Sequence, residues 1–387
     1  MHYCSVKRFY RLLFLLLPLL ITACSTFRAD IAESPKTRGW LGKGGSIAQS
    51  SFRKSGPRPP LELVETISFE GAPPRNLVAI DSTIIVATQN GKIYTCRIGQ
   101  GKKGKALKLP HNNEGMVVAQ ENGLLIIGLI IGNKTLFCYD LKKGKYLWQT
   151  RAGLLASEPV LDDGSVFVAA RLKHVDRYDM LDGKRIWRFD LDSQIHTTPA
   201  ISGNILAFGS DSGTIYGLKK SSGEKIWQQK LDSPIFASPV IAGDRVFFAS
   251  LHGTIYAFSL SMGRLQWTYK ATGWIRRTPA TNASVLIIGA GDGSVEALEE
   301  ESGRILWRFE AGAGIGTTPL IVGDVIYVGS LDHHLYALSV AEGKLLWKKK
   351  LDGRVRTNPI VFGDYLIAGS EDRNIYVFRN GKSDNEQ

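Results

Sequence analysis

A repeat of about 40 residues runs through most of the chain and limits the folds that it can adopt. Six prolines follow one another at intervals of 40 residues, and six tryptophans follow at intervals of 39 or 40. A glycine lies four residues before each tryptophan. Three residue types that keep one register over some 200 positions indicate one repeated structural unit. The positions are Pro159, Pro199, Pro239, Pro279, Pro319 and Pro359; Trp148, Trp187, Trp227, Trp267, Trp307 and Trp347; and Gly144, Gly183, Gly223, Gly263, Gly303 and Gly343.

Each unit has the pattern of four short β-strands. In one unit the runs are 198–202, 205–210, 214–218 and 225–230, and they are rich in β-branched and aromatic residues. Glycine, serine, aspartate and asparagine separate these runs, as expected for tight turns. No stretch of the repeats keeps a helical period. Four strands in each repeated unit are typical of a β-propeller blade.

The number of units predicts eight blades. The first two units match the pattern less well, as terminal repeats often do. Inner strands are expected to begin near Leu77, Met116, Pro159, Pro199, Pro239, Pro279, Pro319 and Pro359.

The last unit stops after its third strand, at 374–379, and the run at 61–67 precedes the first unit. That run can supply the missing outer strand, which would remove the open edge between the first and last blades. We therefore predict an all-β fold: an eight-bladed β-propeller of four-stranded antiparallel blades over residues 61–380. An N-terminal strand completes the last blade, and residues 381–387 form a disordered tail.

The three repeated residue types have structural roles. The glycine permits the positive φ of a hairpin turn. The tryptophan can lie against the neighbouring blade and bury a large flat face. The proline marks the entry into the innermost strand, where a missing N–H does least harm. We interpret the tryptophans as core residues and not as ligand-binding residues.

The first 23 residues are interpreted as an export signal. Lys7, Arg8 and Arg11 precede an apolar run at 12–21 that is too short for a permanent transmembrane helix. The run ends in Leu-Ile-Thr-Ala-Cys at 20–24, which resembles the bacterial lipobox. This resemblance implies lipidation of Cys24 and a location at the periplasmic face of the outer membrane. The alternative is an ordinary signal peptide with a chance cysteine.

Residues 24–60 are expected to be a lipidated, flexible and basic linker. The segment is rich in Ser, Gly and Pro and has seven basic residues against two acidic ones. Its charge could attract anionic headgroups, but a solvated tether is the favoured interpretation. Trp40 is either an interfacial anchor or a docking residue.

The whole chain has a net charge of +12, and the signal and the linker carry about +8 of it. The remaining +4 is too small to indicate a nucleic-acid-binding fold.

The pattern resembles the PQQ-type β-propeller repeat family. The matching motifs are Tyr-Ala-Leu, Gly-x-x-x-Trp, Thr-Pro and Gly-Ser-x-Asp-Gly, over roughly 61–380. With a lipobox and few insertions, the chain is most similar to the family's lipoprotein scaffold of the outer-membrane β-barrel assembly machinery. That resemblance implies a non-enzymatic role. The implied partners are an assembly subunit with periplasmic repeat domains, the membrane through a lipid anchor, and unfolded outer-membrane proteins.

One departure from the family affects the expected partner site. Members of the family carry a Leu-x-Leu-Arg-type stretch in the partner-binding loop. The connections at 191–197 and 231–237 lack it. Partner-binding residues are therefore not transferred by position, and a different periplasmic or envelope partner stays open.

A redox enzyme is the rival class. Quinoprotein dehydrogenases share the repeat and bind PQQ with calcium in the central funnel. The units here have almost no insertions, and no loop is dense enough in Asp and Glu to suggest calcium. No catalytic motif is present, so we predict no enzyme, no cofactor and no metal site. A disulfide between Cys96 and Cys138 stays open, with weak support.

The loops around one mouth of the funnel form the candidate partner-binding surface. Loops from outer to inner strands and from second to third strands open on the same face of a propeller. A basic rim with aromatic residues could dock an acidic protein surface. The alternative is that the loop tips are polar only because they are exposed to solvent. The candidates are Arg151, His196, His252, Trp274, Arg276, Arg277, Arg354 and Arg356.

Overall fold

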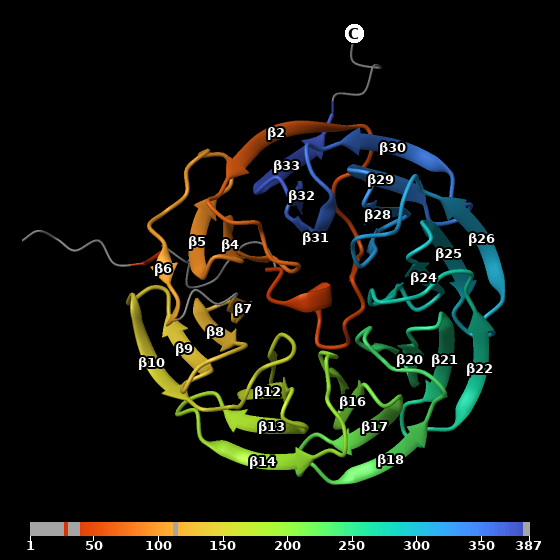
Figure 1. Cartoon of the computed structure of the whole chain (residues 1–387). Coiled ribbons are helices and arrows are strands. Elements are labelled where there is room, and N and C mark those ends of the chain that lie inside the picture. The colour runs from red at the N-terminus through yellow and green to blue at the C-terminus, as the bar shows by residue number, and fades with distance from the viewer. Residues whose placement is uncertain (1–26, 30–38, 111–114, 382–387) are drawn as a thin grey trace, which may run out of the picture.

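The computed structural model describes residues 27–29, 39–110 and 115–381. Within them the chain forms a ring of eight β-sheets around a central funnel, which confirms the predicted eight-bladed propeller (Figure 1). The export signal, Cys24 and all but one residue of the expected C-terminal tail lie outside the described residues. No helix in the described parts is long and apolar enough to cross a membrane.

Each blade is a four-stranded antiparallel sheet, and in the first seven blades the strands follow chain order from the funnel outward. The repeated alternation of short β-prone runs and glycine turns gives each unit this meander. The first four blades comprise β3 (Val78–Ile80), β4 (Thr83–Thr88), β5 (Lys92–Arg97) and β6 (Leu107–Lys108); β7 (Gly115–Ala119), β8 (Leu124–Leu129), β9 (Leu136–Asp140) and β10 (Lys145–Thr150); β11 (Val160–Asp162), β12 (Ser165–Ala170), β13 (His174–Asp179) and β14 (Arg185–Asp190); and β15 (Ala200–Ser202), β16 (Ile205–Gly209), β17 (Thr214–Lys219) and β18 (Lys225–Lys230).

The second half of the ring repeats this plan. Its strands are β19 (Val240–Ala242), β20 (Arg245–Ala249), β21 (Thr254–Ser259) and β22 (Leu265–Lys270); β23 (Ala280–Thr281), β24 (Val285–Gly289), β25 (Ser294–Glu299) and β26 (Ile305–Glu310); β27 (Leu320–Val322), β28 (Val325–Gly329), β29 (His334–Ser339) and β30 (Leu345–Lys350); and β31 (Val355–Phe362), β32 (Tyr365–Ser370) and β33 (Asn374–Asn380).

The N-terminal strand β2 (Leu61–Ser68) closes the ring. It pairs antiparallel with β33, from Leu61 opposite Asn380 to Ser68 opposite Asn374. It is therefore the outer strand of the eighth blade, as predicted, and the first and last parts of the propeller share one sheet (Figure 1). This arrangement leaves no open edge where the ring begins and ends.

The repeated tryptophans join neighbouring blades. The Trp227 ring lies on Gly263 of the next blade, where an added Cβ would stand 2.6 Å from the ring. The Trp227 Nε1–H donates to the Leu260 carbonyl at 2.7 Å. The same ring position and hydrogen bond recur for Trp148, Trp187, Trp267 and Trp307. The glycine is thus required both for its positive φ and for the space that the ring occupies.

The two cysteines inside the propeller are free thiols. Cys96 and Cys138 are buried in different hydrophobic cores, so the disulfide that the sequence left open is not formed. Burial raises the pKa of the Cys96 thiol to about 12 and that of Cys138 to about 11. Both thiols are therefore protonated and unreactive at neutral pH.

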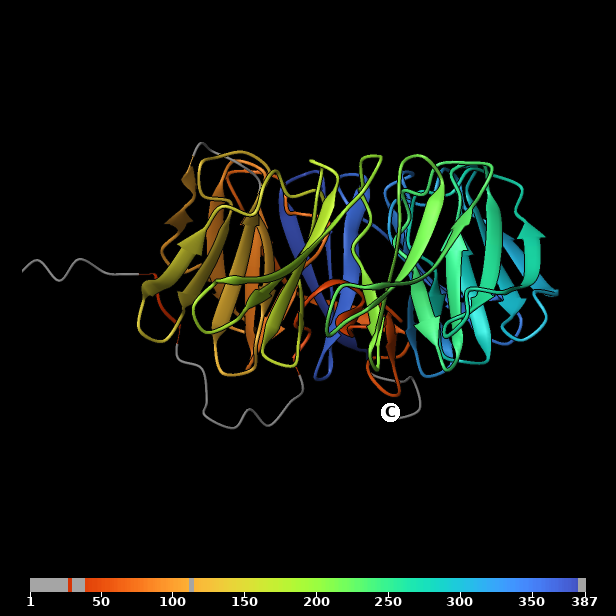
Figure 2. The ribbon, with the colours of Figure 1, turned by 90° about the horizontal axis from the view of Figure 1, so that it is seen from below.

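Residues 39–53 follow the inside of the ring and are called the strap. It contains the short 3-10 turn η1 (Lys43–Gly45) and β1 (Phe52–Arg53), which pairs in parallel with β27. Figure 1 shows the strap as the red segment at the centre, and Figure 2 shows it between the two faces of the ring. Six strap carbonyls accept a hydrogen bond from the backbone N–H of an inner-strand residue: Ala79, Ala119, Ile201, Ile241, Thr281 and Ile321.

The strap differs from the flexible tether that composition suggested. Trp40 is only 3% exposed, and the Arg53 guanidinium lies 4.6 Å from its ring centroid. Trp40 is therefore a core residue of the described chain. The polar, glycine-rich composition was misleading because the backbone of this segment, and not an apolar side-chain pattern, makes most of its contacts.

Candidate docking surface

Antiparallel pairing places two sets of loops on one face of the ring, here called the rim face. They are the connections from each outer strand to the next inner strand and the loops between second and third strands. The turns between first and second strands lie on the opposite face, here called the turn face. All eight candidate residues lie in rim-face connections or at the adjoining strand ends.

Three of the candidates share a continuous row of side chains on blades four to six. The centroids of the His196 and Phe236 rings lie 5.8 Å apart, and the Arg276 guanidinium lies 5.4 Å from the Phe236 ring centroid. Arg276 also lies 5.9 Å from the Trp274 ring. We call His196, Phe236, Arg276 and Trp274 the rim row. Trp274 is 50% exposed, so the row presents a large aromatic surface to solvent.

Contacts with neighbouring loops hold the side chains of the rim row in place. His196 Nδ1 lies 2.8 Å from a carboxylate oxygen of Asp211. The Trp274 ring covers Gly291, where a Cβ would stand 1.9 Å from the ring. The Trp274 backbone carbonyl accepts the Gly291 N–H at 2.9 Å. These contacts fix the orientation of an imidazole and an indole that are both open to a partner.

Sequence reasoning missed Phe236, although the repeat held the signal. His196, Phe236 and Arg276 all stand three residues before a repeated proline, 40 residues apart. They therefore occupy the same place on three consecutive blades. A comparison of loops by repeat position would have found the row, whereas a search for basic residues passes over the phenylalanine.

Arg277 points to a different environment from Arg276. It is half-buried, and burial together with the nearby charges of Arg75 and Arg356 lowers its pKa to about 9. Burial also lowers the pKa of the Lys43 ammonium of the strap. The charges of Glu158, Arg75 and Arg277 act on this ammonium as well. Lys43, Arg75 and Arg277 thus form a basic funnel cluster at the mouth of the funnel.

Polar side chains that stand two residues before the start of an inner strand surround this cluster. The Asn76 amide and the Thr198 hydroxyl both donate to the Glu158 carboxylate, the latter at 3.1 Å. The Lys43 ammonium donates to the Ser238 hydroxyl at 2.7 Å. Glu158 is therefore already engaged, and the mouth of the funnel keeps an excess of positive charge.

The remaining candidates are not joined to the rim row. Arg356 Nε lies 2.8 Å from an oxygen of Glu371. Arg151, His252 and Arg354 are exposed and lie on other loops of the rim face. The structure therefore brings together three of the eight candidates in one surface, adds Phe236, and turns Arg277 toward the funnel.

The funnel does not fit a calcium site. Calcium takes six to eight oxygen ligands, mostly carboxylates and carbonyls. The described residues contain no group of three or more His, Cys, Asp or Glu side chains that could hold a metal ion. The funnel mouth is lined instead by Lys43, Arg75 and Arg277, whose charges repel a cation.

The fold and repeat place the chain in the class of PQQ-type β-propellers, with a cationic, aromatic rim and a strap inside the funnel. A family model described as outer membrane protein assembly factor BamB matches residues 171–291 and 291–384, which is more than half of the chain. The chain therefore belongs to the BamB family. No curated protein matches the chain.

Solved structures of two functional classes share this fold. BamB from Moraxella catarrhalis is 19% identical, with a TM-score of 0.70 over 82% of this chain and 99% of that one. A europium-containing methanol dehydrogenase is 12% identical, with a TM-score of 0.74 over 90% of this chain and 98% of that one. A quinohemoprotein alcohol dehydrogenase from Comamonas testosteroni is 13% identical, with a TM-score of 0.74 over 89% of this chain and 81% of that one.

Proposed function

We propose that the chain is a non-enzymatic scaffold lipoprotein of the periplasm that assists the assembly and insertion of β-barrel outer-membrane proteins. The observation that carries this proposal is the rim row, an ordered and exposed aromatic and cationic surface, on a chain of the BamB family. A rigid ring with such a surface is suited to holding another protein. The proposed partner is the barrel-assembly subunit with periplasmic repeat domains.

The chemistry of the rim favours an acidic partner surface. Tryptophan and arginine are the residues that most often dominate the binding energy of protein interfaces. Arg276 can pair a carboxylate in a bidentate manner. The basic funnel cluster extends the same positive potential behind the row, which attracts an acidic surface from a distance.

We propose that Cys24 carries the lipid and that the propeller faces the periplasm from the outer membrane. Acyl chains on a single cysteine provide the two or more hydrophobic signals that stable anchoring needs. Metabolic labelling with an alkyne fatty acid tests this: the wild type should be labelled and sediment with membranes, and Cys24→Ser should do neither. Labelling of Cys24→Ser would exclude this residue as the lipid site.

A quinoprotein dehydrogenase is the second candidate, because two dehydrogenases share the fold. The cationic funnel mouth and the strap argue against the calcium-dependent chemistry of that class. The purified protein should not reduce an electron-accepting dye with methanol or ethanol after incubation with PQQ and calcium. Saturable, PQQ-dependent turnover would establish an enzyme.

Charge reversal on the rim face tests the docking surface. The double variant Arg276→Glu with Arg277→Glu should lose capture of the assembly subunit from detergent-solubilised membranes. The matched control is Lys225→Glu with Arg264→Glu, which makes the same charge change at exposed sites by the strand ends of the opposite face. Both proteins should keep the circular dichroism spectrum of the wild type. Unchanged capture by the rim variant would exclude the rim as the docking site.

A further inference from the structure

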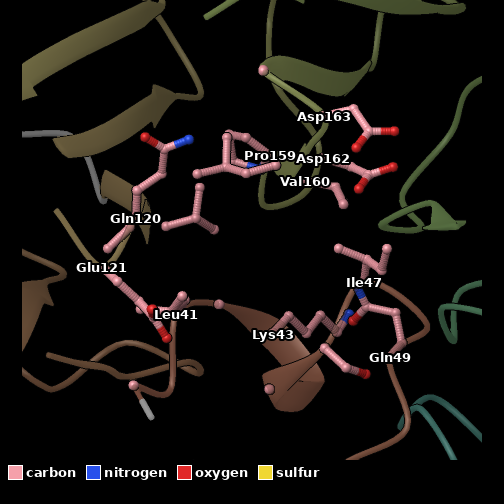
Figure 3. A pocket seen from close by; sticks show the side chains of 18 of the residues that line it. Leu41, Lys43, Ile47, Gln49, Gln120, Glu121, Pro159, Val160, Asp162 and Asp163 are labelled. Carbon is pink, nitrogen blue, oxygen red and sulfur yellow. The ribbon is translucent and has the colours of Figure 1, made fainter. Parts of the chain in front are cut away.

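A cavity of about 570 Å³ lies between the strap and the inner strand β11. Figure 3 shows Leu41, Lys43 and Ile47 of the strap on one side and Pro159, Val160 and Asp162 of the third blade on the other. The volume is in the range of sites that hold small ligands or short peptides. We call this cavity the β11 gap.

The gap exists because the strap pairs with the inner strands of the second and fourth blades but not with that of the third blade between them. Its carbonyls pair with inner strands on both sides, at Ala119 through Leu41 and at Ile201 through Ile47. Leu161 is the equivalent residue of β11, and no described residue accepts its N–H. Leu161 is also only half-buried, whereas Ala119 and Ile201 are fully buried.

The Leu161 N–H points into the gap. The turn at Asp163 and Gly164 joins β11 and β12, with Asp162 opposite Ser165 and Leu161 opposite Val166. In such a two-residue hairpin the pair next to the turn exchanges hydrogen bonds, and the following pair directs its N–H and C=O groups outward. The main chain of Leu161 therefore offers an unused donor on an open strand edge.

The length and the glycines of the strap account for its bend away from β11. Between Ile47 and Ser51 the strap passes from β15 to β27 with one or two residues for each blade, but it uses six residues from Leu41 to Ile47. The extra residues fold into a compact turn around η1. A Cβ on Gly44 would stand 2.7 Å from the Gln49 backbone, and a Cβ on Gly45 would stand 2.9 Å from the Trp40 ring. The strap is thus long enough to follow β11 and is folded away from it.

The turn-face end of the gap is acidic. Glu121, Asp162 and Asp163 line it, and the Lys220 ammonium lies 2.6 Å from an oxygen of each of the two aspartates. Lys220 therefore pairs with both aspartates, and the Arg177 charge also acts on Asp163, whereas no described residue forms an ion pair with Glu121. Lys43 also lines the gap but directs its ammonium to Ser238, toward the rim face. An occupant that reaches this end meets the unpaired Glu121 carboxylate and the Asp162 carboxylate, which shares its ammonium with Asp163.

We propose that the β11 gap binds an extended, basic segment of a partner polypeptide. A carbonyl of this segment accepts the Leu161 N–H, as strap carbonyls do on six other blades, and a lysine or arginine side chain reaches Glu121 and Asp162. Main-chain pairing on an open strand edge is an established mode of peptide recognition. The gap opens toward the turn face, so this proposal is independent of docking at the rim row.

Hydrogen exchange of the unmodified protein gives the first test. The Leu161 amide should exchange rapidly. The Ile201 and Ile241 amides donate hydrogen bonds to strap carbonyls and should be protected. Addition of the peptide acetyl-Val-Lys-Val-Lys-amide should slow exchange at Leu161, and acetyl-Val-Glu-Val-Glu-amide should not. Strong protection of Leu161 without peptide would show that the chain itself fills the gap and would overturn the proposal.

Two variants test the contacts with the fluorescein-labelled basic peptide. Leu161→Pro removes the N–H on a strand edge where proline is tolerated, and we expect binding about five- to tenfold weaker. Glu121→Lys should weaken binding about threefold. Val361→Pro is the matched control, because Val361 holds the same position on β31 and does not line the gap. Equal binding by Leu161→Pro and the wild type would refute main-chain pairing, and the absence of saturable binding to the wild type would refute the site.

Discussion

Replacing Gly263 by alanine should weaken the propeller more than replacing Gly243, because only Gly263 lies under a tryptophan of the preceding blade. Both glycines have a left-handed backbone, with φ of 62° and 57°. A Cβ on Gly243 would meet no atom within 4 Å, whereas a Cβ on Gly263 would stand 2.6 Å from Cδ2 of Trp227. The pair therefore separates backbone strain from the contact between blades.

The expected magnitudes follow from these two terms. The left-handed conformation costs a residue with a Cβ about 1–2 kcal/mol, and both variants carry this cost. Forcing a methyl group against a buried, rigid ring adds about 1–3 kcal/mol. Gly243→Ala should lower the free energy of unfolding by about 1–2 kcal/mol and Gly263→Ala by about 2–5 kcal/mol.

Urea unfolding followed by tryptophan fluorescence measures the difference. A double-mutant cycle with Trp227→Ala then identifies its source, because removal of the ring should reduce the cost of Gly263→Ala to that of Gly243→Ala. Equal costs for the two alanine variants, or the same cost of Gly263→Ala with and without the ring, would refute the role assigned to the repeated Gly–Trp pair.

Three further predictions concern single sites. Trp40→Ala should lower the free energy of unfolding by about 3–5 kcal/mol, because Trp40 is a core residue of the strap, and a tether residue would show no change in the urea midpoint. Arg188→Met should cost about 3 kcal/mol, because it leaves the buried Asp176 carboxylate without its bidentate partner; an unchanged midpoint would contradict this. Burial alone would raise the pKa of Asp176, but interactions with Arg188, His174 and Tyr178 hold it at about 2, below its ordinary value of 3.8. The depressed pKa contributes about 2 kcal/mol of stability above pH 4, and this contribution should disappear as the pH falls from 4 to 2 in the wild type but not in Asp176→Asn, as measured by urea midpoints at each pH.

The repeat made the ring predictable, and the closing strand followed from it. Pro199, Trp227 and Gly223 recur in a fixed register, and each is required by a local contact that every blade repeats. The run at 61–67 could be assigned to the last blade because the eighth unit lacked one strand. Such features depend on neighbours at a constant distance along the chain, so a single sequence is enough to show them.

The strap could not be predicted in the same way. Its carbonyls pair with residues such as Ala79 and Ile321 that lie up to 270 positions away, and main-chain pairing leaves no side-chain pattern. The β11 gap is a consequence of the strap, so it could not be predicted from the sequence either. On the rim, sequence reasoning found His196, Trp274 and Arg276 by residue type. It missed Phe236 because the row is defined by repeat position and not by charge.

The most direct test of the scaffold proposal is site-specific crosslinking in cells. A photoreactive amino acid would replace Trp274 on the rim face, and a control protein would carry it in place of Leu181, which is highly exposed on the opposite face. After irradiation, affinity purification from solubilised membranes should recover a β-barrel assembly subunit with periplasmic repeat domains from the Trp274 position and not from the Leu181 position. Recovery of no such subunit, or of an electron-transfer protein in its place, would contradict the proposed function.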